Sequence, residues 1–248
     1  RKCQLEAVFS TTVAVLLAEW NAAATFDQVV HPQTLLARWL DYRIEPQGHI
    51  ERFLESVCYV PADTTGLLIQ GSVYPNPLAY ARRVELWEHS RPIDAIFGFQ
   101  HGDLNLGNIL VKFGENGKDL EGYYLIDFSL FQPHAPLLYD QVYMEMSYLL
   151  QELSRVPFAD WVSWVTCFVE RDIPHLDQVP ISLAGACSVL RAGRQAFERW
   201  LRAAHPSLYD DLWAQYWLGA VAAGLNFCNK AALPPQERLA GLIFAAAH

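Results

Sequence analysis

Apolar side chains recur at helical spacing through most of this chain. Near its start, Leu5, Phe9 and Val13 follow the three-to-four-residue spacing of one helix face, which predicts a helix over residues 4–24. Further helices are predicted at residues 32–42, 50–58, 78–89, 140–153, 158–171, 181–204, 209–228 and 235–247. The pattern therefore predicts a mainly helical body.

The middle of the chain has a different pattern. Short apolar runs at residues 95–99, 109–113 and 123–126 are typical of strands. Residues 114–122, rich in Gly and polar side chains, separate the last two runs and predict a hairpin. A Gly- and Pro-rich stretch at residues 62–77 predicts a loop. The expected fold class is mainly α (α+β), a helical body with one small β-hairpin.

Composition excludes several classes of function. Of the 248 residues, 52% are hydrophobic, which is ample for a folded core, and the net charge of −9 argues against a nucleic-acid partner. No apolar stretch reaches the roughly 20 residues that span a bilayer, so no membrane partner is expected. The five cysteines are odd in number and widely spaced, which favours reduced thiols in a cytoplasmic protein.

Some polar and aromatic side chains leave alternatives open. Tryptophans at helical spacing, such as Trp161 and Trp213, are typical of a core, with a pocket lining as the alternative. Glu145 and Glu152 share one predicted helix and are expected to lie on its solvent-exposed face. The alternative is that they line a site for a cationic substrate. The connection that contains Asp172, His175 and Asp177 is interrupted by proline and predicts an exposed loop, with a substrate-recognition loop as the alternative.

Two motifs in the middle of the chain carry candidate chemistry. The first is the sequence His-Gly-Asp-Leu-Asn-Leu-Gly-Asn at residues 101–108, and the second is Leu-Ile-Asp-Phe at residues 125–128. Antiparallel pairing of residues 109–113 with 123–127 would return Asp127 to the side of Asn108. Asp103, Asn108 and Asp127 are then three oxygen donors of the kind that Mg²⁺ prefers.

These motifs resemble the aminoglycoside phosphotransferase and choline kinase branch of the protein-kinase-like superfamily. The resemblance implies the helical C-terminal lobe of a kinase-like fold, with the metal site on the hairpin. It implies that Asp103 is the catalytic base and that His101 braces the catalytic loop. Asn108 and Asp127 would bind Mg²⁺ and through it ATP, and Asp140, at the start of the next helix, would anchor the loop.

The implied reaction is transfer of the γ-phosphoryl group of ATP to a hydroxyl of a small molecule. A complete enzyme of this type also needs a nucleotide-covering lobe with a Gly-rich loop and a Lys. No such Gly-rich loop occurs here and no Lys sits in a predicted strand ahead of the catalytic loop, so residues 1–248 are expected to form a single large lobe whose N-terminal lobe lies upstream. That lobe, and further domains of the same chain, are the expected protein partners.

Two alternatives remain from the sequence. One is a catalytically silent kinase-like module that acts in signalling or defence within a multidomain bacterial protein, since the chain is also similar to ternary complex associated domains. The other is a plain helical interaction domain, which would require both motifs to be accidental. Asn105 stands where protein kinases usually carry a Lys near the transferred phosphate, which favours a small-molecule acceptor over a protein.

Overall fold

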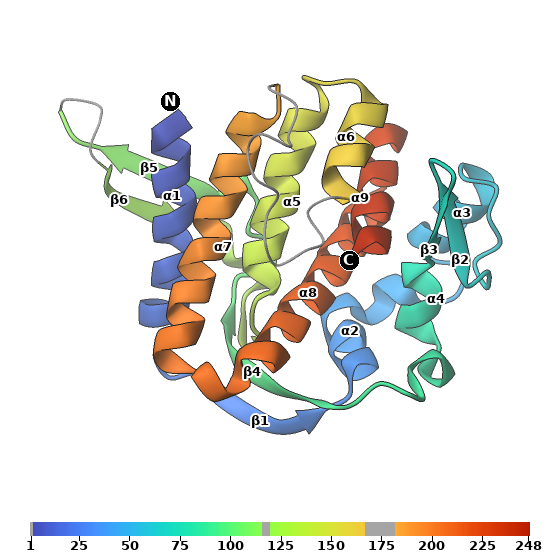
Figure 1. The fold of residues 1–248 in the computed structure, drawn as a ribbon, viewed down its shortest axis with the longest axis horizontal. Helices are drawn as coiled ribbons and strands as arrows, with labels where there is room; N and C mark the ends of the chain where they lie inside the picture. Colours follow the sequence, from blue (N-terminus) through green and yellow to red (C-terminus); the bar gives the residue numbers. More distant parts are fainter. Residues whose placement is uncertain (1, 116–119, 167–181) are drawn as a thin grey trace.

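The computed structural model describes residues 2–115, 120–166 and 182–248. Its helices are α1 (Lys2–Val15), α2 (Pro32–Leu40), α3 (His49–Ser56), α4 (Pro77–Arg82), α5 (Tyr139–Leu153), α6 (Phe158–Thr166), α7 (Ala184–Ala204), α8 (Tyr209–Asn229) and α9 (Pro235–Ala247). Its strands are β1 (Thr25–Val30), β2 (Gly66–Ile69), β3 (Ser72–Pro75), β4 (Ile93–Gln100), β5 (Ile109–Phe113), β6 (Leu120–Leu125) and β7 (Gln132–Pro136). The predicted fold class, mainly α with small antiparallel sheets, is confirmed (Figure 1).

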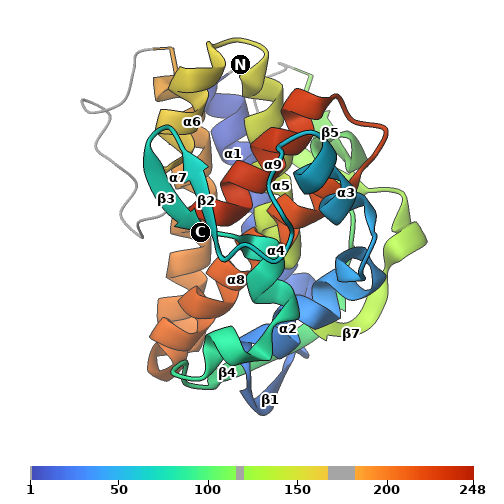
Figure 2. The same cartoon turned by 90° about the vertical axis from the view of Figure 1, so that its right-hand side faces the viewer.

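Helices α5 and α8 form the centre of the helical body. Both are buried on almost every side, as expected for helices that are apolar around most of their circumference. Helices α1 and α7 lie together on one side of α5, and α2, α3 and α4 lie on the other side of the molecule (Figures 1 and 2). This arrangement leaves α5 in contact with both the helical core and the loop of residues 101–108.

Helices α8 and α9 cross at very short range. A Cβ atom placed on Gly224 would lie 2.5 Å from the carbonyl oxygen of Gly241, and one on Gly241 would lie 2.7 Å from the carbonyl oxygen of Gly224. Backbone therefore packs directly on backbone at this crossing, and only glycine fits at either position. The crossing fixes the C-terminal half of α8 against α9.

Strand β4 is the middle of a three-stranded antiparallel sheet with the order β1-β4-β7. Gln215 of α8 holds this sheet to the helices. Its side chain accepts a hydrogen bond from the Ile96 amide at 2.9 Å and donates to the Ile96 and Leu137 carbonyls at 3.0 and 2.9 Å. The separate β5–β6 hairpin projects beside α1 (Figure 1).

Several boundaries differ from the sequence prediction. The first helix ends at Val15 and continues only as a π-helical turn, Leu16–Trp20, before strand β1 begins. The helix expected over residues 78–89 is the short α4 followed by a 3-10 turn, and the loop expected over residues 62–77 contains the β2–β3 hairpin. Strand β7 was not predicted. These are local elements whose state is decided by tertiary pairing, which apolar spacing does not reveal.

The expectation that Glu145 and Glu152 form a solvated helix face is wrong. Glu145 is only 3% exposed and forms an ion pair with Arg194 of α7, at 3.0 Å between Oε2 and a guanidinium nitrogen. Glu152 is also buried and pairs with Arg155 at 2.6 Å. Burial of a carboxylate requires a charged partner, and a helix surrounded by other helices has no solvated face on which to place it.

The core prediction for the tryptophans is confirmed for Trp161, Trp164 and Trp213, while Trp200 and Trp217 are half-buried and pack against the core. Trp161 and Trp213 are buried, and Trp213 packs edge-to-face on Phe197 with ring centroids 4.8 Å apart. Cys58 and Cys228 carry free thiols. In the described ranges, every helix is too short or too polar to cross a bilayer.

Candidate functional site

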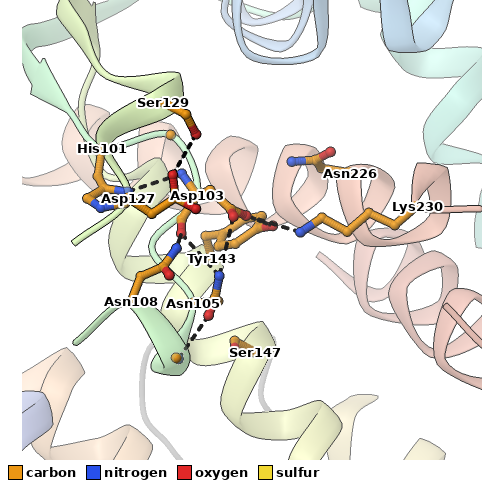
Figure 3. A network of polar contacts seen from close by, with 12 residues as sticks. His101, Asp103, Asn105, Asn108, Asp127, Ser129, Tyr143, Ser147, Asn226 and Lys230 are labelled. Atoms are coloured by element: carbon orange, nitrogen blue, oxygen red, sulfur yellow. Dashed lines mark hydrogen bonds and ion pairs between the residues drawn. The ribbon is translucent and has the colours of Figure 1, made fainter. Parts of the chain in front are cut away.

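One face of α5 holds the loop of residues 101–108. Asp140, Tyr143 and Ser147 lie three and four residues apart on this helix, so their side chains point to the same side. Each contacts a different part of the loop: Asp140 its first two residues, Tyr143 the carboxylate of Asp103, and Ser147 the amide of Leu106, at 3.2 Å. Figure 3 shows side chains of this loop together with Tyr143 and Ser147 of α5.

Asp140 fixes the beginning of the loop. Its two carboxylate oxygens accept hydrogen bonds from the backbone amides of His101 and Gly102 at 2.6 and 2.9 Å. Burial raises the pKa of this carboxyl to about 6, and the two amides act in the opposite direction. At neutral pH the group is therefore ionised and accepts both bonds. The anchoring position expected for Asp140 is the one observed.

Gly102 allows the sharp turn that follows. Its φ of +84° lies in the left-handed region, and a Cβ atom on it would lie 2.5 Å from the carbonyl oxygen of Leu130. Only glycine adopts this conformation without strain and fits in this space. The turn directs the next side chain, Asp103, away from the buried carboxylate of Asp140.

His101 links the loop to the hairpin. Its Nε2 donates to the carbonyl of Ile126 at 2.8 Å, and its Nδ1 accepts from the amide of Asp103 at 3.4 Å. These contacts define the tautomer with the proton on Nε2. The imidazole also packs on Phe128 with ring centroids 4.9 Å apart. His101 is buried and positions its neighbours, which matches its expected bracing position.

Asp103 lies at the centre of a polar cluster. Its Oδ1 accepts from the Tyr143 hydroxyl at 2.5 Å and forms an ion pair with Lys230 Nζ at 3.0 Å. Its Oδ2 is contacted by the Asn105 amide at 3.3 Å, a long hydrogen bond. Burial raises the pKa of Tyr143, so its hydroxyl stays protonated and keeps donating to the carboxylate. The Asp103 side chain is 23% exposed, so a ligand can reach it.

Asn108 and Asp127 are joined through the hairpin. Ile109 pairs with Leu125, and the Ile126 amide donates to the Asn108 carbonyl at 3.0 Å. The antiparallel hairpin is confirmed, but residues 109–113 pair with 120–125 rather than with the predicted 123–127. The Asn108 side-chain amide donates to the carbonyl of Asp103 at 2.8 Å. Asp127 directly follows Ile126, so the three oxygen donors Asp103, Asn108 and Asp127 meet in one region (Figure 3).

The backbone at Asp127 is unusual. It adopts a left-handed conformation with φ 61° and ψ 65°, which costs an L-residue about 1–2 kcal/mol although Asp tolerates it better than most. Ser129 Oγ donates to its Oδ1 at 2.8 Å, and the side chain is exposed. The conformation holds the carboxylate at the surface, next to the loop of residues 101–108.

The oxygen donors suit a magnesium ion. In the described part of the chain, no group of three or more His, Cys, Asp and Glu side chains converges as a metal site. Mg²⁺ commonly takes one or two carboxylates and completes its shell with waters and phosphate oxygens. Asn108 uses its amide nitrogen for Asp103, which leaves its side-chain oxygen for another partner. Asn108 and Asp127 would hold the ion.

A groove of about 850 Å³ lies beside this cluster. It runs between α1 and β6 and is lined by Trp20, Tyr123 and Phe128, the last of which adjoins Asp127. Cavities of roughly 300–1,000 Å³ with apolar and aromatic walls are the usual size for small-molecule sites. The candidate metal ligand Asp127 thus has space for a small ligand nearby.

The sequence-predicted residues all lie in this one region, but two contributors were missed. Tyr143 and Lys230 contact Asp103 from positions 40 and 127 residues away. Tyr143 could have been found, because it lies one helical turn after Asp140 on the same face. No comparable spacing in the sequence predicts the contact between Lys230 and Asp103. The loop candidates Asp172, His175 and Asp177 lie outside the described residues.

Replacement of Asp140 by Asn tests the anchoring contact through its pH dependence. A carboxyl whose pKa is raised in the folded state stabilises the fold fully below the unfolded pKa of 3.8 and loses that contribution as the pH rises through about 6. The unfolding free energy of the wild type minus that of the variant should therefore fall between pH 4 and 6. Urea unfolding at several pH values measures it, with Asp160→Asn, an exposed carboxylate on α6, as the control. A flat or rising difference would contradict this.

Fold and site together define a mainly helical α+β protein with a loop-and-hairpin cluster of oxygen donors. The particular family follows from sequence comparison: the family model for ternary complex associated domain 9 matches residues 4–165, more than half of the chain. The chain belongs to this family. The match includes every motif residue described above and ends before α7, α8 and α9. No curated protein and no solved structure matches the chain.

Proposed function

We propose that this chain is a kinase-like phosphotransferase, which transfers the γ-phosphoryl group of ATP to a hydroxyl of a small molecule. The main observation in support is that Asp103, Asn108 and Asp127 lie together on a loop and hairpin. Asp140 holds this loop by accepting hydrogen bonds from two of its backbone amides. Phosphoryl transfer depends mainly on positioning and charge, which a braced set of oxygen donors supplies. The reaction is proposed to take place in the cytoplasm.

In this proposal Asp103 orients and deprotonates the acceptor hydroxyl. Tyr143 and Lys230 occupy Oδ1, so Oδ2 is the oxygen that faces the acceptor. The contact of Oδ2 with Asn105, at 3.3 Å, is the weakest of the three and the easiest for an acceptor hydroxyl to replace. Tyr143 and Lys230 hold the carboxylate in one orientation, which is what a base needs for aligned proton transfer.

Asn108 and Asp127 are proposed to bind Mg²⁺ together with the phosphates of ATP. The bound ion would neutralise charge on the transferred group. His101 and Ile126 keep these two side chains in register, since the backbone of Ile126 bonds to both His101 and Asn108. The exposed position of Asp127 fits a ligand that arrives from solvent with its metal.

Mg²⁺-dependent ATP binding, measured by calorimetry on the intact protein, tests the proposal. Binding that weakens at least about tenfold in Asp127→Asn is expected, because the variant replaces a charged metal ligand by a neutral one. Asp160→Asn, which removes an exposed carboxylate on α6, is the matched control and should bind like the wild type. Absence of binding at millimolar ATP in the wild type would reject the phosphotransferase.

The second candidate is a silent kinase-like module that works in a multidomain assembly. Two observations favour it: Oδ1 of Asp103 is already paired with Lys230 and Tyr143, and the family is described as associated with a ternary complex. Such a module would keep the fold and bind its neighbours without turnover. Failure to bind nucleotide in the calorimetry would favour this candidate.

A further inference from the structure

Lys230 brings a positive charge to the candidate site from a distant part of the chain. It directly follows α8, and its ammonium group lies 3.0 Å from Asp103 Oδ1. The same group lies over the rings of Tyr143 and Phe227, 5.2 and 5.1 Å from their centroids. Figure 3 shows the side chain extended from α8 toward Asp103 and Tyr143.

The loop of residues 101–108 has no cation of its own. Its sequence contains two Asn and one Asp but no Lys or Arg, and Asn105 donates only an uncharged amide. A phosphoryl group in transfer carries negative charge on its outer oxygens, which is best stabilised by a fixed positive group in a partly dehydrated site. A positively charged side chain that acts beside the proposed Mg²⁺ must therefore come from another element.

We propose that Lys230 binds the terminal phosphoryl group of the nucleotide. This rests on the function proposed above. The acceptor hydroxyl that contacts Asp103 must lie beside the phosphorus it attacks, and Lys230 Nζ is within hydrogen-bond distance of the same carboxylate. An ammonium has three donors, so Lys230 can keep Asp103 and donate to a phosphoryl oxygen at the same time.

The surroundings of Lys230 favour binding of an anionic ligand by its ammonium group. Its side chain is 34% exposed, so a phosphate can reach it from solvent. The two aromatic rings hold the ammonium by cation–π attraction without supplying a competing negative charge. Since a partly exposed ion pair contributes little to stability, replacing Lys230 should leave the protein folded.

The test compares Mg²⁺-dependent binding of ATP and ADP by calorimetry in the intact wild type, Lys230→Met and Lys230→Arg. A lost charge-assisted hydrogen bond predicts that Lys230→Met weakens ATP binding by about 10- to 100-fold. ADP binding should change less than about twofold, because ADP lacks the terminal phosphoryl group. Lys230→Arg, which keeps the charge, should retain most of the preference for ATP.

A purely structural role would change ATP and ADP binding equally or change neither, and either result would overturn the inference. Thermal unfolding of the two variants verifies that both are folded, and Lys230→Arg supplies the comparison if the Met variant is not. If the wild type binds neither nucleotide, the proposed phosphotransferase itself is rejected and the role of Lys230 with it. If the wild type and Asp127→Asn behave as expected but Lys230→Met keeps its preference for ATP, only the role of Lys230 is rejected.

Discussion

Replacement of Asp103 by Asn is expected to lower the rate of phosphoryl transfer by about 10²- to 10⁴-fold, the usual contribution of a general base. Asn has nearly the same shape and still accepts the hydrogen bond from Tyr143, but it cannot take up the proton of the acceptor hydroxyl. ADP release over time, with a panel of small-molecule alcohols as acceptors, measures the rate.

Asp160→Asn is again the matched control, and its turnover should equal that of the wild type. Thermal unfolding of Asp103→Asn should show only a small change, since the lost ion pair with Lys230 is partly exposed and contributes at most about 1 kcal/mol. Unchanged turnover in Asp103→Asn would remove Asp103 as the base and the phosphotransferase assignment with it.

The second large effect concerns stability. Arg194→Met should lower the free energy of unfolding by about 3–5 kcal/mol, because it leaves the carboxylate of Glu145 buried without a countercharge. Arg194 contacts both oxygens of that carboxylate, at 3.0 to 3.3 Å, and Tyr216 donates its hydroxyl to one of them. Burial alone lowers the pKa of Arg194, but the adjacent Glu145 outweighs this and raises it, so the guanidinium stays charged.

Urea unfolding measures this loss, and a double variant separates its cause. Glu145→Leu combined with Arg194→Met removes both buried charges, so it should recover a large part of the stability that Arg194→Met alone loses. Recovery will be incomplete because the Tyr216 hydroxyl then has no acceptor. A loss below about 1 kcal/mol in Arg194→Met would mean that water reaches Glu145 readily and that the site is not buried in solution.

The long helices and the hairpin could be predicted because their signals are local. In α8 and α9 the apolar residues follow helical spacing over thirteen or more positions, and both helices appear within one residue of the predicted bounds. Strand β7 could not be predicted in this way. It contains two prolines in five residues, which normally argue against a strand, and it forms because β4 offers it an unpaired edge.

The candidate site could likewise be predicted only where its residues lie close together in the sequence. Asp103, Asn108 and Asp127 lie within one short segment, so a motif and a hairpin register were enough to group them. Lys230 reaches Asp103 only because α8 passes over α5 and ends beside the loop, which depends on how the whole helical body packs. The prediction for Glu145 failed for a related reason. An acidic side chain in a helix is expected to face solvent unless a buried partner is known, and the partner here, Arg194, lies on another helix.

The close crossing of α8 and α9 gives helix α9 a share in aligning the side chains of the candidate site. Gly224 and Gly241 let the two backbones touch, and Arg238 of α9 donates to the carbonyl of Cys228 at 2.7 Å, two residues before Lys230. The spacing between the ammonium of Lys230 and the carboxylate of Asp103 is therefore set by helix packing rather than by the loop. A signal that shifts α9, such as a neighbouring domain docking against it, would reach Asp103 through Lys230 without touching the loop.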